Sequence, residues 1–236
     1  MKAIILAAGA GRRLGLDGPK SMAPIAGTSI IHRQLHAFGS AGVDQFVIVV
    51  GYQHEKLREH LAEQSAACTY IFNQDYATTN TIYSLYLARQ HFEGGAFYAN
   101  ADVVFDHRLP QRLSDAQGAG ALAVNVGTCG EEEVKVIVHQ DRILQIGKQL
   151  DPAQCLGEFV GVARFAPQIA GPFIDSLADL VEKQGVIDDY LELALHRICA
   201  QQVLKVVNVS DLPCMEIDFP EDLEKAHTQI SRQLSR

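Results

Sequence analysis

The sequence has no tryptophan, no pairing pattern among its cysteines and no surplus of basic residues. Its five cysteines are scattered through 236 residues and never form a C-x-x-C pair, which argues against a disulfide framework and against a zinc site. The formal net charge is −8 and no basic stripe interrupts it, so we expect no nucleic-acid partner. Any phosphate that the protein binds must therefore be held by a few local groups.

Long hydrophobic runs are also missing. The first apolar run, KAIILAA, passes directly into glycines and arginines, which fits neither a signal peptide nor a membrane span. We therefore expect a cytoplasmic protein that does not associate with a membrane.

Strand-like apolar runs alternate with amphipathic helical segments in the first half of the chain. Helices are expected over about 29–40, 55–63 and 81–91, and they separate the strands AIILA, QFVIVVG, TYIFN and GAFYAN. This alternation predicts an α/β protein with a mostly parallel central sheet that helices cover on both faces.

The rhythm changes after about residue 118. Strands are expected at GALAVNV, on both sides of a hairpin at HQDR, at GEFVGVARF and at VLKVVNV, with helices over about 167–183 and 188–200 and at the C-terminus. The second half therefore reads as a small mixed β subregion, and its strands are compatible with a homodimer contact. We find no linker, and the length suits a single domain over 1–236.

The segment LAAGAGRRLGLDGPKSM places small residues, glycines and basic residues directly after the first strand. A dinucleotide fingerprint would need a third glycine after Gly9 and Gly11, and a Walker A loop would not carry Pro19 before its lysine. What remains is a loop whose backbone amides can approach a triphosphate, with Arg13 and Lys20 to neutralise it. As the alternative, the glycines only turn the chain and the arginines are solvated.

Two aspartates in other parts of the chain are candidate metal ligands. Asp102 follows the strand GAFYAN, at the strand end where open α/β sheets present ligands, and Asp218 lies in MEIDFPEDL just before a helix. Mg²⁺ takes one or two carboxylates plus phosphate oxygens, so two aspartates suffice. Capping of a turn or helix is the alternative for each. His32 and His36 share a helix face but lack a third ligand.

The ordered pattern L-A-A-G-x-G-x-R-L followed by P-K closely resembles the signature of nucleoside-triphosphate transferases. The segments NQDYATTNTIYSL, IGKQL, GEFVGVARF and EIDFPEDL resemble, in the same order, the choline-phosphate and aminoethylphosphonate cytidylyltransferases. The resemblance covers nearly the whole chain and is loosest at about 103–135. It implies a Rossmann-like, GT-A-like nucleotidyltransferase fold, with a nucleotide-binding half over about 1–117 and an acceptor-binding and closing half over about 118–236.

The resemblance also implies roles for individual residues. It makes Arg13 and Lys20 catalytic, and Asp102 and Asp218 the ligands of Mg²⁺, although Asn100 replaces the first carboxylate of the family's D-x-D pattern and Asp222 serves the following helix. The nucleotide would contact Leu6, Ala7, Ala8, Gly9, Ala10, Gly11, Asn80 and Ser84. The acceptor would meet Lys148 at its phosphoryl group, Glu158 at its polar head, and Tyr83 and Asp189 nearby. Asn80 and Ser84 could instead start a helix, and Lys148 and Glu158 could be solvated.

The implied activity is transfer of CMP from CTP to a small phosphorylated or phosphonate acceptor, with Mg²⁺ as cofactor and pyrophosphate as the second product. Such an acceptor is already anionic, so it can attack in line without a general base. Choline phosphate is disfavoured because a quaternary ammonium wants an aromatic cage, although a partial one could come from Tyr83, Tyr86, Phe159 and Tyr190. A primary amine would need carboxylates, for which Glu158, Asp188 and Asp189 are available.

Two alternatives from other classes stay open. A sugar-1-phosphate nucleotidylyltransferase with another nucleotide would commonly be longer than this chain. A nucleotide-binding regulator without activity would have no evident need for Arg13, Lys20, Asp102 and Asp218 together.

Overall fold

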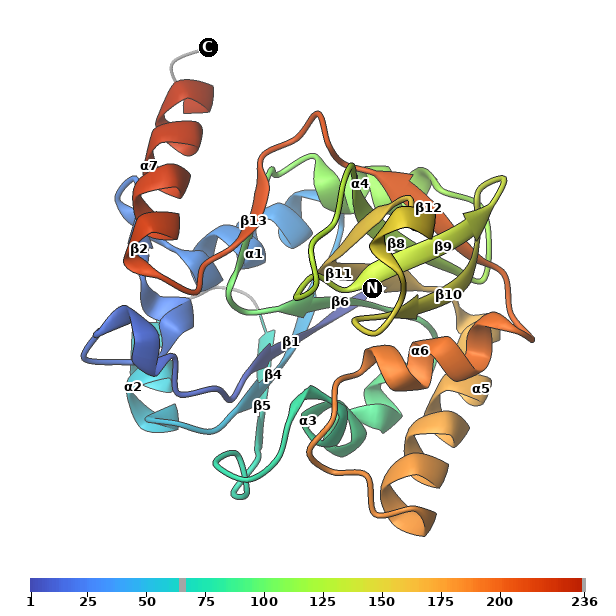
Figure 1. The fold of residues 1–236 in the computed structure, drawn as a ribbon. Helices are drawn as coiled ribbons and strands as arrows, with labels where there is room; N and C mark the ends of the chain where they lie inside the picture. Colours follow the sequence, from blue (N-terminus) through green and yellow to red (C-terminus); the bar gives the residue numbers. More distant parts are fainter. Residues whose placement is uncertain (64–66, 235–236) are drawn as a thin grey trace.

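The computed structural model describes residues 1–63 and 67–234, which form a nine-stranded mixed sheet with helices on both faces (Figure 1). One half of the sheet is parallel and consists, in spatial order, of β5 (Ala67–Phe72), β4 (Gln45–Val50), β1 (Lys2–Ala7) and β6 (Ala96–Asn100). The Val, Ile and Ala side chains of β4, β1 and β6 are buried on both faces, as expected for central parallel strands, whereas β5 at the edge of the sheet is partly exposed. The predicted α/β class is therefore confirmed.

The other half of the sheet is mixed. It contains β8 (Gly120–Val126), β9 (Lys135–His139), β10 (Arg142–Gly147), β11 (Gly157–Phe165) and β12 (Leu204–Asn208). Here β11 runs antiparallel to both β6 and β8, and β9 pairs with β10 and again with β11, so these strands curl back on themselves (Figure 1). Since β12 runs parallel to β8, these strands form the mixed β subregion that the sequence predicts for the second half, and the hairpin connection between β9 and β10 accounts for antiparallel pairing there.

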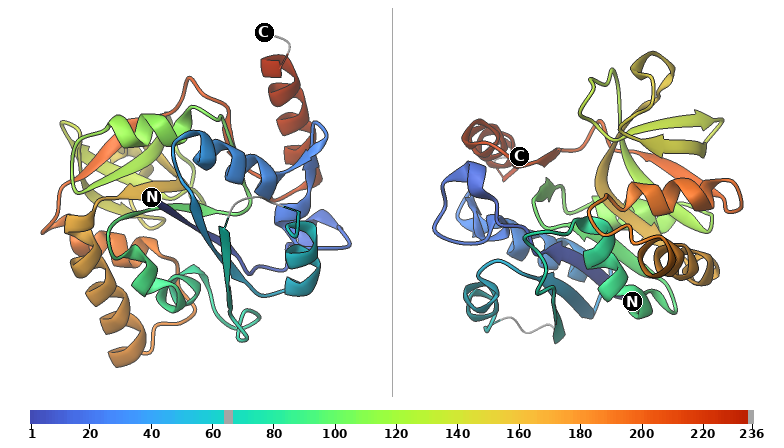
Figure 2. Two further views of the ribbon diagram at one scale, coloured as in Figure 1. Left: turned by 180° about the vertical axis from the view of Figure 1, so that it is seen from behind. Right: turned by 60° about the horizontal axis from the view of Figure 1, so that its bottom comes forward.

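Helices cover each face of the sheet with a separate apolar core. On one face lie α1 (Ile30–Ser40), α2 (His54–His60) and α4 (Leu109–Asp115), and on the other lie α3 (Thr81–Leu87), α5 (Pro167–Ala178) and α6 (Glu192–Cys199). Figure 2 shows α1 and α4 in the view from behind, and it shows α3, α5 and α6 in the second view. Alternate residues of β1 serve the two cores, since Ile4 belongs to one and Ile5 to the other.

A two-stranded antiparallel ribbon joins the middle of the chain to the segment before the C-terminal helix. Its strands are β7 (Val103–Phe105), which follows β6, and β13 (Cys214–Glu216), which precedes the C-terminal helix α7 (Pro220–Leu234). Near α7 lies the hairpin β2 (Pro24–Ile25) and β3 (Thr28–Ser29), and an apolar cluster joins β2 to α7. The C-terminal segment is thereby held beside the loop that follows β1 (Figure 1).

Helix boundaries differ from the expected ones where the backbone has other partners. The helix expected over 188–200 begins only at Glu192, because the carbonyls of Ile187 and Asp189 accept hydrogen bonds from Asn80 and Ile82 at the start of α3 (2.9 and 3.1 Å). The helix expected over 81–91 is divided into α3 and a 3₁₀ turn, Arg89–Phe92. In the part of the chain that the structure describes, no helix is both long and apolar enough to cross a bilayer.

Candidate active site

The loop after β1 brings Lys20 close to the glycines. Gly11 has φ +53°, and a Cβ at this position would lie 2.6 Å from Cβ of Lys20, so only glycine fits there without displacing the lysine. Lys20 begins a 3₁₀ turn, Lys20–Met22, directly after Pro19. Gly9 differs, because a Cβ built on it meets no atom within 4 Å, and its backbone borders the cavities described below. Gly9 therefore leaves open space in which a ligand can approach the main chain.

Lys20 lies between the two predicted metal ligands. Its Nζ is 2.8 Å from Oδ2 of Asp102 and donates a short hydrogen bond to Oδ1 of Asp218. Burial alone would lower the pKa of Lys20, but the two carboxylates outweigh burial and raise its pKa above the ordinary value. The ammonium group is therefore held charged at neutral pH.

The β7–β13 ribbon places Asp218 beside Asp102 although the two are far apart in sequence. Glu216 is opposite Val103 in the ladder, and the amide of Ile217 donates to the carbonyl of Asp102 (3.0 Å). Asp222 accepts hydrogen bonds from the amides of Asp218 (3.1 Å) and Phe219, so it caps α7 and fixes the backbone that carries Asp218. The expected role of Asp222 in the helix start is thus confirmed.

Glu216 is a third carboxylate at this place, and the sequence reasoning missed it. Carboxylate oxygens of Asp102, Glu216 and Asp218 all lie within 4.8 Å of one another. Partial desolvation and the neighbouring carboxylates of Asp102 and Asp218 raise the pKa of Glu216 to about 7. Glu216 stands two positions before Asp218, at the end of a strand. Residues two positions apart in extended backbone point to the same face, so this spacing was the available signal.

The three carboxylates suit a hard divalent cation. Oxygen ligands at this spacing are what Mg²⁺ prefers. Oδ1 of Asp102 is buried and has no hydrogen-bond partner among the described residues, whereas Oδ2 of the same carboxylate pairs with the ammonium group of Lys20. The residues present therefore fit the Mg²⁺ ion that the sequence resemblance implied.

Arg13 approaches the same cluster from the loop. Its Nη1 is 3.8 Å from Oδ2 of Asp218, and its guanidinium lies over the ring of Phe219, 5.5 Å from the ring centre. The side chain is 68% exposed, which leaves the guanidinium accessible to a phosphate chain.

Gln34 holds the turn that carries Asp102, and no sequence pattern singled it out. From α1 its Nε2 donates to the carbonyls of Asn100 and Val103, 2.8 Å each, so it clamps both sides of the turn. Asn100 in turn accepts from the hydroxyl of Tyr98 and packs where Gly161, at φ +73°, leaves no room for a Cβ. A polar residue on the buried face of α1 was the only sign of this role.

Two adjoining cavities meet at Gly9, Asn80 and Asp102. The first contains the proposed nucleotide-side residues Leu6, Ala7, Gly9, Gly11, Arg13, Lys20, Asn80, Asp102 and Asp218. The second, of about 310 Å³, extends toward Ser84, Lys148, Glu158, Tyr190 and Glu192. The structure therefore brings most of the predicted residues to one place.

Some predicted residues lie elsewhere or also serve the fold. Tyr83 and Asp189 are not among the residues that line these cavities: Tyr83 stacks on Tyr86, and Asp189 accepts from the amide of Tyr190 (2.7 Å). Ala10 also lies outside both linings. Asn80 caps α3, so the alternative suggested for it, a helix start, holds alongside its place in the cavity. Ser84 lies inside α3 and accepts from Asn73 (3.1 Å), so it does not start the helix, and it also lines the cavity.

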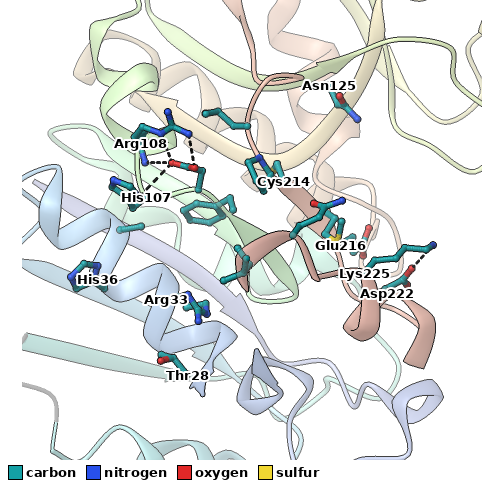
Figure 3. Close-up of a pocket in the computed structure, with 18 of the residues that line it drawn as sticks. Thr28, Arg33, His36, His107, Arg108, Asn125, Cys214, Glu216, Asp222 and Lys225 are labelled. Atoms are coloured by element: carbon teal, nitrogen blue, oxygen red, sulfur yellow. Dashed lines mark hydrogen bonds and ion pairs between the residues drawn. The ribbon is translucent and has the colours of Figure 1, made fainter. Parts of the chain in front are cut away.

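A larger and more open cleft lies on the other side of the β7–β13 ribbon (Figure 3). It is bordered by α1, α4 and α7, and its labelled residues include Arg33, His107 and Lys225. Lys20, Asp102 and Asp218 do not line it, and Arg108 is tied to Asp106 at 2.8 Å. We therefore place the chemistry in the two smaller cavities.

Replacing Gly9 or Gly11 by alanine separates ligand approach from backbone strain. We expect Gly11→Ala to lower the free energy of unfolding by about 1–2 kcal/mol, because its φ is left-handed and Lys20 is too close. Gly9→Ala should change that free energy by less than about 1 kcal/mol, yet weaken binding of the nucleotide that the sequence resemblance implies, CTP, because the methyl group would enter the cavity. Urea unfolding and CTP titration measure the two effects. Unchanged CTP affinity of Gly9→Ala would contradict close approach at this residue.

Glu192 provides a test of pH dependence. Burial raises its pKa from 4.5 to about 7, so above neutral pH the fold carries a desolvated charge that it lacks near pH 4. At 1.36 kcal/mol for each pKa unit, Glu192→Gln should raise the free energy of unfolding by up to about 3 kcal/mol at pH 8. The gain should fall through pH 7 and vanish near pH 4. Urea unfolding from pH 4 to 8 measures it, and a gain independent of pH would contradict the assignment.

Comparisons with known proteins identify the family and the fold. The family model described as "MobA-like NTP transferase domain" matches residues 3–170. The chain is 29% identical over 98% of its length to a CMP-5'-(3-aminopropyl)phosphonate synthase of Streptomyces rubellomurinus, and 28% identical over 91% to a 2-aminoethylphosphonate cytidylyltransferase of Lancefieldella rimae. The chain covers 39% of the length of the former protein and 91% of the length of the latter. Other curated relatives that it matches are also covered over only about half of their length.

A solved structure of the CTP:phosphocholine cytidylyltransferase of Streptococcus pneumoniae has the same fold. Its TM-score is 0.84, with 21% identity over 96% of this chain and 97% of that one. The nucleotidyltransferase fold expected from the sequence is thereby confirmed.

Proposed function

Because the chain belongs to the family of MobA-like NTP transferase domains, we propose that it is a Mg²⁺-dependent cytidylyltransferase for a small phosphonate or phosphoalcohol. It would join CMP from CTP to the acceptor and release pyrophosphate. Relatives named for aminopropylphosphonate and aminoethylphosphonate support this choice of acceptor. The observation that carries the proposal is the contact of Lys20 with both Asp102 and Asp218, which joins the glycine-rich loop to two separate carboxylate segments.

The reaction needs positioning and charge compensation more than proton transfer. A phosphonate oxygen attacks the α-phosphorus of CTP, and a new P–O bond forms while the bond to the bridging oxygen of the β-phosphate breaks. Pyrophosphate leaves with that electron pair. Since the attacking group is already an anion at neutral pH, no general base is required.

The residues of the chain would divide the work by position. The main chain at Gly9 and Gly11 lets the triphosphate approach, and the charges of Lys20 and Arg13 offset the repulsion between two anions and the charge on the leaving group. Asp102 and Asp218, with Glu216 beside them, would hold Mg²⁺. When bound, Mg²⁺ supplies a Lewis acid that polarises phosphate oxygens.

Pyrophosphate release tests the proposal directly. Purified protein with Mg²⁺ is assayed with CTP, UTP, ATP and GTP, each against 2-aminoethylphosphonate, phosphocholine and a panel of sugar-1-phosphates. We expect the highest rate with CTP and 2-aminoethylphosphonate. A clear preference for a sugar-1-phosphate and another nucleotide would support the alternative transferase. Nucleotide binding without pyrophosphate release from any pair would leave only the regulator.

A further inference from the structure

Glu192 is a buried carboxylate that the reaction described above does not use. It lies in the first turn of α6, is only 8% exposed, and lines the cavity that extends from Asp102. Its Oε2 has no hydrogen-bond partner among the described residues. An unpaired carboxylate oxygen in a protein interior costs free energy, so its persistence in a cavity wall points to a ligand that supplies the missing donor.

The charge of the cavity indicates the sign of that ligand. Of the described residues that line it, six are acidic and only Lys148 is a lysine or arginine: Asp102, Glu132, Glu133, Glu158, Glu192 and Glu216 form the acidic set. Lys148 does not neutralise Glu192 by direct contact, because its Nζ lies over the ring of Tyr190, 4.5 Å from the ring centre, and forms no ion pair with Glu192. Asp102 and Glu216 belong to the carboxylate cluster at the reacting end, so the rest of the lining has four acidic residues, Glu132, Glu133, Glu158 and Glu192, against one lysine. The part of the cavity away from the reacting phosphates therefore favours a cation.

The aromatic side chains of the cavity distinguish between kinds of cation. A quaternary ammonium has no N–H and binds through aromatic faces. Three aromatic side chains line the cavity: Phe159 is buried in the core, Tyr76 packs against Tyr52 (6.3 Å between ring centres), and one face of Tyr190 is covered by Lys148. Few ring faces of the described lining are therefore free to form a cage. A primary ammonium instead carries three N–H donors, which suit an unpartnered carboxylate oxygen.

We infer that Glu192 receives the primary ammonium group of a zwitterionic acceptor and makes the site selective for a primary amine over a trimethylated one. This inference rests on the proposed cytidylyltransferase function, in which the acceptor's phosphonate faces Asp102 and Lys20. Asp102 and Glu192 border the same cavity of about 310 Å³, and the inference requires one acceptor molecule to extend within it from Asp102 to Glu192.

Proton linkage gives a second consequence. Burial raises the pKa of Glu192 to about 7, while Lys148 lowers it and Asp189 raises it; Tyr98 also lies within the influence of this carboxylate. A bound ammonium favours the ionised form, so at pH 7 binding should release about half a proton. The phosphonate of the acceptor also titrates near neutral pH, so the same binding to Glu192→Gln should release about half a proton less than binding to the wild type.

The test uses three matched acceptors: 2-aminoethylphosphonate, its N,N,N-trimethyl derivative and ethylphosphonate, which lacks the cation. For the wild type we expect kcat/KM for the primary amine to exceed that for each of the others at least tenfold. Glu192→Gln should lose at least tenfold toward the primary amine and change less than threefold toward the other two. Asp175→Asn, an exposed carboxylate on α5 outside the cavity, is the matched control and should keep the wild-type values.

The outcomes separate the inference from the proposed function. An unchanged preference in Glu192→Gln, or a wild type that prefers the trimethyl compound, would overturn the inference while leaving the cytidylyltransferase intact. If no acceptor released pyrophosphate from CTP, the proposed function would fail. Calorimetric titration with 2-aminoethylphosphonate in buffers of different ionisation enthalpy then decides about Glu192 by itself, since greater proton release by the wild type than by Glu192→Gln supports the inference and equal release refutes it.

Discussion

Lys20→Met is expected to lower turnover of the cytidylyltransferase reaction about a thousandfold, as removal of one preorganised charge-stabilising group commonly costs 10²–10³-fold. The side chain of Lys20 is 14% exposed, and its ammonium group lies between Asp102 and Asp218, where the phosphates of CTP would enter. Methionine keeps the length of the side chain and removes only its charge and donors. Steady-state pyrophosphate release at saturating CTP measures the loss.

A second measurement distinguishes a catalytic loss from a folding defect. Without Lys20 the carboxylates of Asp102 and Asp218 face each other uncompensated, so we expect a lower Tm in metal-free buffer and recovery on addition of Mg²⁺. Lys56→Met removes a lysine whose partner is the exposed Asp17 (2.8 Å), and it should match the wild type in both measurements. Near-normal turnover of Lys20→Met would refute the role given to Lys20.

Asp218→Asn should be as severe as the lysine variant. An amide keeps the shape of the side chain but loses the charge that would hold Mg²⁺, and metal-ion stabilisation of the transition state is worth several kcal/mol, about a thousandfold in rate. Asp102→Asn should behave alike, because both carboxylates contact the same lysine and lie within 4.8 Å of Glu216. Rate against Mg²⁺ concentration measures the effect, and both variants should require far more metal.

Metal-dependent stability provides the check that does not depend on turnover. Mg²⁺ should raise the Tm of the wild type, because a ligand that binds only the folded state stabilises it, and the rise should be lost in Asp218→Asn. Asp211→Asn, which breaks an exposed ion pair with Arg112, should retain the rise. A wild-type Tm that does not respond to Mg²⁺, together with full activity in a chelator, would contradict the metal site.

Local patterns predicted the first half of the fold well. The strand GAFYAN corresponds to β6, and the helix expected over 29–40 corresponds to α1, which begins after Ser29 because the serine side chain caps it. Both signals are local: strand alternation and caps depend on residues within a few positions. The pairing of β9 with β11 depends on residues that are distant in the sequence, and no local pattern predicts it.

The candidate site shows the same division. Arg13, Lys20, Asp102 and Asp218 stand in recognisable motifs, and the resemblance assigned them a shared purpose that the geometry is consistent with. Tyr83 and Asp189 were chosen by proximity in sequence to such motifs, and the backbone turned Tyr83 toward Tyr86 and tied Asp189 to the start of α3. Proximity along the chain does not specify the direction in which a side chain points.

By itself the sequence determined the class of the fold, and it predicted a phosphate-binding loop after β1 and a pair of aspartates that belong with it, because these follow from short patterns of residue size, charge and spacing. Only the tertiary structure decided that Glu216 joins those aspartates, that Gln34 clamps their turn and that Glu192 faces the acceptor cavity unpaired. Those three roles depend on distances between segments far apart in the chain, which are set by packing and strand pairing rather than by any residue's neighbours.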